Sequence, residues 1–213
     1  MDDTQPKEEA AHRSTERGDE RRQSLVLAAY QIIAKKGFEG LRVREVAARI
    51  GVNIATLHYY FNSKEDLIRG VVEYLLHQFI TVEAPLPAEG VQNALQKLHQ
   101  SFADLQYQLQ VAPEMFVVLT ELHLRSQRDP AIQSMLTALN DGWQMHIEEI
   151  YREGLQQQLF RPDVDPHRAA SWLIALIKGL SLQVVSNLEH FDFNLIATEF
   201  IAGFLNPPTK GEL

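Results

Sequence analysis

Residues 43–64 of the chain, VREVAARIGVNIATLHYYFNSK, carry two short helical patterns that meet at Gly51. Two helices that cross at a steep angle need a tight connection, which glycine often supplies. The expected buried positions of this segment are all apolar: Val46, Ala47, Ile50, Val52, Leu57 and Phe61. The second pattern leaves a hydroxyl, an imidazole and phenols for solvent or a ligand. The segment therefore predicts a helix-turn-helix whose second helix enters a DNA groove.

The rest of the chain after residue 21 also reads as helix. An apolar stripe at helical spacing precedes Gly37, formed by Leu25, Ala28, Ala29, Ile32 and Ile33. Ser63 followed by Asp66 predicts the start of a fourth helix, which continues to about Ile80. Further helices are expected over 91–109, from Pro113, from Pro130, from Pro166 and over 193–205, because cap residues or prolines mark their starts. No strand-like alternation of useful length appears, so an all-α fold of about nine helices is predicted.

Three regions are expected along the chain. Residues 1–20 are polar and predict a disordered N-terminal tail. Residues 21–66 are expected to form a three-helix DNA-binding domain, and residues 67–213 are expected to form a larger helical bundle. Basic side chains at the inner end of the tail (Arg13, Arg17, Arg21 and Arg22) could touch the DNA backbone, and the alternative is a solvated tail.

Residues 23–68 resemble the DNA-binding domain of the TetR family of transcriptional regulators. The strongest part of the resemblance is TLHYYF at 56–61 followed by SKEDL at 63–67. The other matching residues are Ala28-Ala29, Ile32-Ile33, Gly37-Phe38, Val46-Ala47 and Gly51-Val52. In the family pattern, Tyr usually stands where this chain has His58, and His often stands where it has Tyr59. The resemblance implies a helix-turn-helix repressor with a helical body that encloses a small effector.

Charge and resemblance together indicate which residues meet DNA. Residues 13–64 contain 10 Lys and Arg against 5 Asp and Glu, whereas residues 81–213 contain 8 against 16. A basic N-terminal part can bind phosphates while an acidic C-terminal part limits nonspecific adhesion. The alternative is that the basic side chains form an ordinary solvated surface. The expected DNA-binding residues are Arg42, Arg44, Asn53, Ala55, Thr56, His58, Tyr59, Tyr60 and Lys64. Among them, Lys64 begins a helix, where charge and helix dipole both favour phosphate.

Composition and the absence of certain motifs argue against several other kinds of protein and site. The absence of cysteine excludes disulfides and thiolate metal sites. The longest apolar run, 172–177, is far shorter than the ~20 residues that span a bilayer, and no secretory signal is recognised at the N-terminus, so a cytoplasmic protein is expected. Enzyme motifs such as a phosphate loop or a Gly-x-Ser-x-Gly elbow are absent, so no enzymatic activity and no cofactor are expected.

The body is expected to hold the effector pocket, and by the resemblance its ligand is a small molecule. Most apolar side chains there need no explanation beyond the core, but pockets are mostly apolar with a few placed polar groups. The candidate pocket residues are Phe102, Leu105, Met115, Leu119, His123, Trp143, His146, Ile147, Trp172, Leu176 and Gln183. The nearest acid–imidazole pairings are His146 with Glu149 and Glu121 with His123. No metal site is predicted, because no HExxH motif is present and residues two apart on a helix do not share a face. The alternative is a cation bound together with the effector. The aromatic side chains favour an apolar or cationic effector over an anionic one.

The last two helices carry small residues among large apolar ones. A monomer could bury these residues internally, but the resemblance favours a two-fold contact between copies of the chain. The expected interface residues are Ala175, Gly179, Val184, Ile196, Phe200, Gly203 and Phe204. A dimer would hold its two helix-turn-helix domains at the ~34–36 Å that separates successive major grooves. The sequence thus predicts a homodimeric repressor of a palindromic operator, released by a small molecule. The alternative is a helical ligand-binding or enzymatic protein with an incidental helix-turn-helix.

Overall fold

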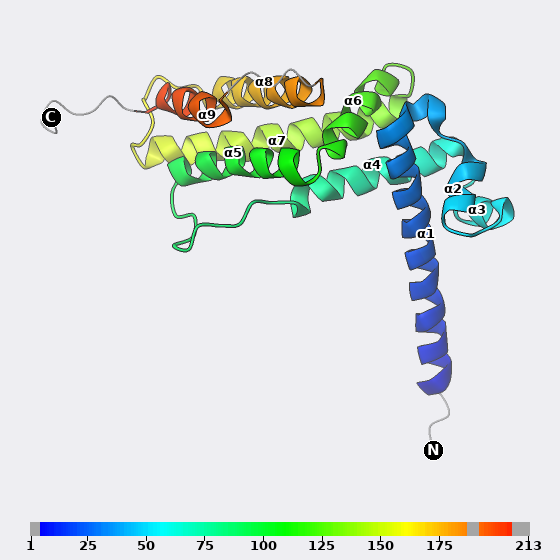
Figure 1. Cartoon of the computed structure of the whole chain (residues 1–213). Coiled ribbons are helices and arrows are strands. Elements are labelled where there is room, and N and C mark those ends of the chain that lie inside the picture. The colour runs from blue at the N-terminus through cyan, green and yellow to red at the C-terminus, as the bar shows by residue number, and fades with distance from the viewer. Residues whose placement is uncertain (1–4, 187–191, 206–213) are drawn as a thin grey trace, which may run out of the picture. The chain divides into compact units, whose positions relative to one another are not determined.

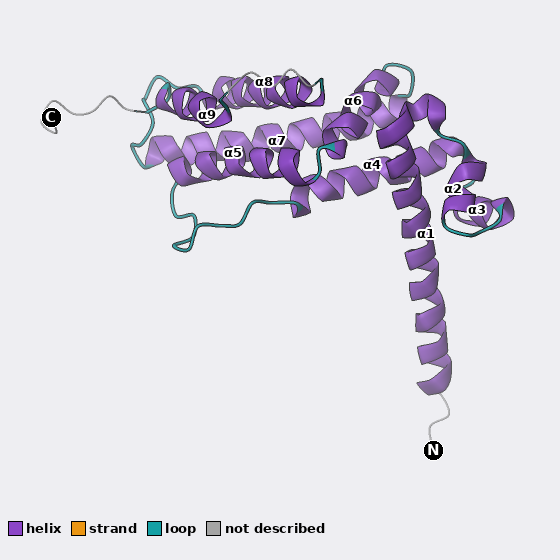
Figure 2. Ribbon diagram, viewed as in Figure 1, coloured by secondary structure: helices purple, strands orange, loops and turns teal. Residues whose placement is uncertain are grey.

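The computed structural model describes residues 5–186 and 192–205, with side chains described from residue 17 onward. Within these residues the chain forms nine helices and no extended strand, which confirms the all-α prediction (Figures 1 and 2). The chain divides into two compact units, residues 1–77 and 78–213, and the division falls inside the fourth helix.

The N-terminal unit contains α1 (Gln5–Gly40), α2 (Val43–Arg49), α3 (Ile54–Tyr60) and most of α4 (Lys64–Thr81). α1 breaks its helical backbone at Gly37, where φ is 65°, a value that favours glycine. Gly70 allows α1 and α4 to approach closely, because a Cβ atom there would lie 3.0 Å from Val26 and 3.2 Å from the Phe61 ring. The core of this unit is apolar, with Leu25, Ile32, Ile33, Leu41, Leu57, Phe61, Leu67, Ile68 and Leu75 fully buried.

The C-terminal unit contains α5 (Ala94–Val111), α6 (Glu114–Ser126), α7 (Pro130–Gln156), α8 (Pro166–Val185) and α9 (Phe193–Ala202). α7 packs against α5, α6 and α8, and α9 packs against α5 (Figure 1). An aromatic cluster forms within this bundle, where the ring of Tyr151 contacts those of Phe160 and Phe204. Gly154 is required beside it, since a Cβ atom would fall 2.0 Å from the Phe160 ring.

The start signals read from the sequence are formed as side-chain caps. The carboxylate of Asp129 accepts a hydrogen bond from the backbone amide of Ala131 at 3.1 Å, and that of Asp165 accepts one from Arg168 at 2.8 Å. Ser63 Oγ accepts from the Asp66 amide at 3.0 Å at the start of α4. Each of these oxygens satisfies an amide that has no partner inside its own helix, which explains why the helix starts were predictable.

Two boundaries differ from the sequence prediction. The sequence predicts a disordered tail over residues 1–20, but α1 begins at Gln5, and only residues 1–4 of the predicted tail lie outside the described part of the chain. The physical reason is that Ala, Glu, Gln, Lys and Arg, which dominate 5–22, are strong helix formers even without an apolar face. The N-terminal unit also extends to residue 77 rather than 66, because Leu67, Ile68, Val71 and Val72 of α4 are buried in its core.

α8 is the one described helix that is long and apolar enough to cross a membrane, with a mean hydropathy of 1.3. This differs from the sequence estimate, which considered only uninterrupted apolar runs and did not average over Lys178 and its polar neighbours. One such helix is weak evidence for a membrane span, because core helices of soluble proteins have the same length and composition. Only a third of the apolar window is buried within the chain, so α8 has apolar surface to cover.

Candidate DNA-binding surface and effector cavity

α3 presents the side chains expected to read DNA. Its N-terminus is capped by Asn53, whose Oδ1 accepts from the Thr56 amide at 2.8 Å and from the Thr56 hydroxyl at 3.0 Å. The preceding turn depends on Gly51, where φ is 71° and the next amide, that of Val52, donates to the Ala47 carbonyl at 3.0 Å. Leu57 anchors the inner face of α3, being fully buried. This anchoring turns the opposite face of α3 outward.

The outward face of α3 is rich in hydrogen-bonding groups. Tyr59 exposes 82% of its surface, and His58 is also exposed. Tyr60 is half-buried, and its ring meets that of Tyr59 edge-to-face with centroids 5.0 Å apart. Hydroxyl and imidazole groups held on a short exposed helix suit the reading of base edges in a major groove.

Basic groups lie next to this helix within the same unit. Arg42 and Arg44 are exposed at the start of α2. Lys64, half-buried at the start of α4, approaches the Phe38 carbonyl at 3.5 Å. The predicted DNA-binding residues are all exposed or half-buried and belong to α2, α3, their flanking turns and the start of α4; they are Arg42, Arg44, Asn53, Ala55, Thr56, His58, Tyr59, Tyr60 and Lys64. Among them, Asn53 holds the helix start, and its Oδ1 is already engaged there.

A cavity of about 330 Å³ lies in the C-terminal unit between the end of α4 and helices α5 to α8. Three aromatic rings form its walls: Phe79 meets Phe116 and Trp143, each edge-to-face with centroids 5.5 Å apart. Polar groups are added by Glu83, Ser101, Asp104, Gln108 and His146, and aliphatic ones by Ile80, Leu105, Ile147 and Ile177. Among the described residues that line the cavity, carboxylates are present and lysine and arginine are not.

Hydrogen bonds fix two polar residues of this cavity. Oδ1 of Asp104 accepts from the Ala84 amide at 2.9 Å and from Nε2 of Gln100 at 2.8 Å. Nε2 of Gln108 donates to the Val82 carbonyl at 2.8 Å and to the Phe79 carbonyl at 3.4 Å. These bonds tie the end of α4 and the chain after it to α5, so the polar lining is ordered by the fold.

Four of the predicted pocket residues line this cavity: Leu105, Trp143, His146 and Ile147. Leu119 and His123 line a separate, small recess, to which Trp143 also contributes. The remaining predicted residues lie elsewhere. Phe102 and Met115 are core residues, Leu176 packs against the core, and Trp172 and Gln183 are exposed on α8. The correction follows from helix facing, because α8 turns these two residues away from the bundle interior.

Sequence reasoning missed several cavity residues, among them Phe79, Glu83, Asp104 and Gln108. A signal for the α5 part was present, since Ser101, Asp104, Leu105 and Gln108 share one helix face at i, i+3, i+4 and i+7. A stripe that mixes polar and apolar groups at core spacing is typical of a lined pocket. Phe79 and Glu83 gave no such signal, because they lie at the junction between α4 and a loop.

A close acid–imidazole pair links α7 to α8, and it is neither of the two pairings considered from the sequence. Among the described residues, no group of three or more His, Asp or Glu side chains is arranged to hold a metal ion. In the close pair, Nδ1 of His167 lies 2.6 Å from Oε1 of Glu148. Hydrogen bonding by His167, Gln144 and Arg152 holds the pKa of the Glu148 carboxyl below its usual value. This cluster ties α7 to the start of α8.

The predicted interface residues divide into two groups. Ala175, Gly179 and Gly203 are exposed, and Val184 and Ile196 are half-buried. Phe200 and Phe204 instead face inward: Phe200 contacts Phe102, and Phe204, only 6% exposed, contacts Tyr151. Phe204, which follows α9, belongs to the core of the single chain, whereas Phe200 of α9 is half-buried and packs against that core.

Two family profiles match the chain. One, described as bacterial regulatory proteins of the tetR family, matches residues 25–71, and the other, described as the C-terminal part of BetI-type transcriptional repressors, matches residues 94–205. The chain belongs to the TetR family. The resemblance seen in residues 23–68 is thereby confirmed. As in its TetR-family repressor relatives, the function is that of a ligand-responsive, DNA-binding transcriptional repressor, and the incidental helix-turn-helix is not favoured.

Relatives match most of the chain in sequence, and a solved structure shares its fold. The nicotine-responsive transcriptional repressor HdnoR of Paenarthrobacter nicotinovorans is 23% identical over 77% of this chain and 83% of its own. The regulator BetI of Agrobacterium fabrum is 28% identical over 76% of each chain. A putative transcriptional regulator from Saccharomonospora viridis, solved in complex with choline, matches 89% of this TetR-family chain and all of its own at 23% identity, with a TM-score of 0.73.

Proposed function

We propose that the protein represses transcription as a dimer on a palindromic operator and leaves it when a small organic cation enters the cavity of the C-terminal unit. The observation that carries the choice of effector is the cavity lining, where Phe79, Phe116 and Trp143 stand beside Glu83 and Asp104. The proposed function is not enzymatic, and we place it in the cytoplasm.

The lining suits a cation for two separate physical reasons. An aromatic face attracts an ammonium group, by about 0.5–2 kcal/mol per well-placed ring. Glu83 and Asp104 add negative charge, and the described lining contains no lysine or arginine to oppose a cation. The volume of about 330 Å³ lies at the lower end of the range for small-molecule sites, which favours a compact ligand.

The names of two similar proteins point to the same chemical class. HdnoR is described as nicotine-responsive, and the Saccharomonospora regulator was solved with choline. Nicotine is a protonatable amine and choline a quaternary ammonium ion, so both can present positive charge to aromatic rings and carboxylates. This support concerns the class of effector, an organic cation, and not the individual compound.

In the proposed dimer, a second copy of the chain packs against the exposed face of α8. Trp172, Ala175, Gly179 and Leu182 follow one face of this helix at i, i+3, i+7 and i+10, and Trp172 and Leu182 each expose more than half of their surface. Leu195 of α9 is exposed to the same degree. A two-fold contact through such a face holds two reading helices at a fixed spacing, as a palindromic operator requires.

Titration calorimetry with matched ligands tests the effector class. Choline and nicotine should bind, whereas 3,3-dimethylbutan-1-ol, a neutral analogue of choline, should bind at least about tenfold more weakly because it lacks the charge that the rings and carboxylates attract. Glu83→Gln should weaken the cations and leave the neutral analogue unaffected. Glu149→Gln is the control, because this carboxylate is exposed on α7 and does not line the cavity.

Two results would contradict the effector assignment. One is tight binding of long-chain fatty acids or polyanions with no response to either cation. The other is equal affinity for choline and its neutral analogue. Neither result would affect the DNA-binding assignment, which is measured separately by retention of operator DNA.

A further inference from the structure

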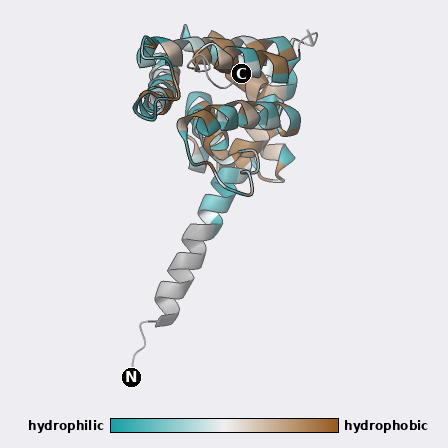
Figure 3. Cartoon of the chain, turned by 90° about the vertical axis from the view of Figure 1, so that its left-hand side faces the viewer, coloured by the Kyte–Doolittle hydropathy of each residue, from teal (hydrophilic) through white to brown (hydrophobic). Residues whose placement is uncertain are grey.

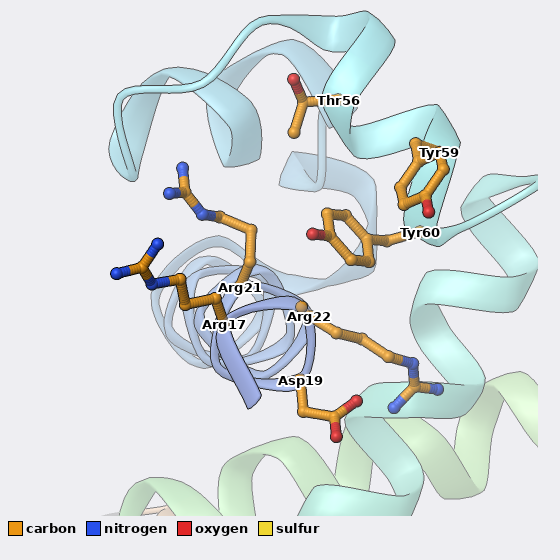
Figure 4. A pocket seen from close by; sticks show the side chains of 8 residues that line it. Arg17, Asp19, Arg21, Arg22, Thr56, Tyr59 and Tyr60 are labelled. Carbon is orange, nitrogen blue, oxygen red and sulfur yellow. The ribbon is translucent and has the colours of Figure 1, made fainter. Parts of the chain in front are cut away.

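The N-terminal part of α1 lies beside α3, the helix expected to read DNA bases. It lies outside the segment that the tetR-family profile matches. That profile begins at residue 25, whereas Arg17, Arg21 and Arg22 precede it. Within the N-terminal unit, a groove of about 690 Å³ is lined by Arg17, Gly18, Asp19, Arg21 and Arg22 from α1 and by Thr56, Tyr59 and Tyr60 from α3 (Figure 4). The groove therefore joins the basic segment directly to the surface expected to read DNA.

The arginines of this groove have different roles. Arg22 is engaged within the fold, because its guanidinium lies 5.1 Å from the centre of the Phe61 ring and 3.6 Å from the Glu73 carboxylate. Arg17 and Arg21 are exposed and four residues apart, so they share one face of α1. Figure 4 shows them pointing to one side of α1, with Thr56 and Tyr60 beside Arg21, while Arg22 points the other way.

The chemistry of the groove favours a phosphate backbone. Two guanidinium groups can bind phosphate oxygens through paired hydrogen bonds, and the hydroxyls of Tyr59 and Tyr60 are further donors. Asp19 is the one carboxylate among the lining residues, against three arginines. Figure 3 shows this part of α1 as hydrophilic, so it offers no apolar face for packing against protein.

We propose that Arg17 and Arg21 extend the DNA-binding surface and hold backbone phosphates flanking the base pairs that α3 reads. The inference rests on α3 as the reading helix, since Thr56, Tyr59 and Tyr60 form one wall of the groove. When α3 lies in a major groove, this wall faces the edge of that groove, where the phosphates run. The two arginines then add affinity and register without adding base specificity.

The test compares the salt dependence of operator binding in two variants. The operator is the fragment that the wild-type protein enriches from a genomic DNA pool. Arg17→Gln/Arg21→Gln removes both guanidiniums and keeps a good helix former at each position. Arg128→Gln/Arg161→Gln is the matched control, because it removes two exposed arginines from the C-terminal unit and changes the net charge equally. Circular dichroism verifies that both variants are folded.

Each lost phosphate contact lowers the slope of log affinity against log salt by about 1, so a dimer that loses four should lose about 3.6. Between 50 and 200 mM salt, the loss of affinity should then be up to about 150-fold smaller for the groove variant than for the wild type. Hydroxyl-radical footprints should lose protection at phosphates flanking the operator, and base preference should be unchanged. The control variant should match the wild type in all three measurements.

Several outcomes would overturn the inference. If the groove variant keeps the wild-type slope and footprint, the arginines do not bind DNA, although DNA binding by α3 stands. The same conclusion follows if inorganic phosphate stabilises the wild type at low millimolar concentration, the groove variant loses that effect, and its DNA slope is unchanged, because the groove then serves a small anion. A wild-type protein with no salt-dependent DNA binding would overturn both this inference and the proposed function.

Discussion

Tyr59 exposes 82% of its surface on a helix whose inner face is fixed by the buried Leu57. A phenol held so far into solvent gains nothing for stability, which suits a contact made only in a complex. We expect Tyr59→Ala or His58→Ala to cost about 1–3 kcal/mol of specific operator affinity with folding intact. Fluorescence anisotropy with operator and scrambled duplexes measures the loss, and thermal unfolding measures stability.

Lys64→Ala provides the contrast for that experiment. Its ammonium group stands at the start of α4, where it meets phosphates in the proposed complex, so its loss should weaken operator and scrambled duplexes equally and flatten the salt dependence. Operator affinity that survives the combined His58→Ala/Tyr59→Ala change would show that α3 does not read bases.

The sequence indicated the exposure of the expected DNA-binding residues better than it indicated the cavity lining, for a local reason. The expected DNA-binding side chains of α3 belong to a short segment with fixed spacing after Gly51, so their exposure follows from the outer face of one helix. The cavity is assembled from five helices and a loop, so a residue such as Phe79 joins Trp143 only through tertiary packing. For Trp172, composition indicated a pocket, but the facing of α8 turned it outward.

At the scale of elements, α8 offers a clean test of dimerisation. A Cβ atom at Gly179 would meet nothing within 4 Å, so a longer side chain there fits the single chain without strain. Gly179→Glu should nevertheless weaken the dimer at least about 100-fold, because an unpaired charge in a closed interface costs several kcal/mol. Sedimentation velocity at micromolar concentration measures the dimer, and operator affinity should fall with it.

Gly142→Glu is the matched control for α8. This glycine of α7 is also exposed, and a Cβ atom added to it would likewise meet nothing within 4 Å, so it accepts the same side chain outside the proposed interface. The two variants should have similar thermal stability as single chains. A Gly179→Glu protein that remains a dimer, or a wild-type monomer that binds a palindrome tightly, would rule out this face as the interface.

Helix starts were predictable because a single cap residue fixes each one, as Asp129 and Asp165 do. The start of α1 was not, since residues 5–20 lack the apolar stripe on which the prediction relied, although their composition favours helix. The division between units was also missed, because α4 continues through it as one helix and gives no loop signal at residue 77.

At the scale of the whole molecule, effector and operator must influence each other reciprocally. A ligand releases DNA only if it binds more tightly to the conformations that bind DNA poorly. The ratio of affinities is the same in both directions, so an effector that weakens operator binding by a factor within about 5–150 must itself bind that many times more weakly to the operator complex. Calorimetric titration of choline or nicotine into free and operator-bound protein measures both sides, and scrambled duplex is the control. Equal effector affinity in the two states would mean that occupation of the cavity is not coupled to DNA release, because a ligand with no preference between conformations shifts no equilibrium.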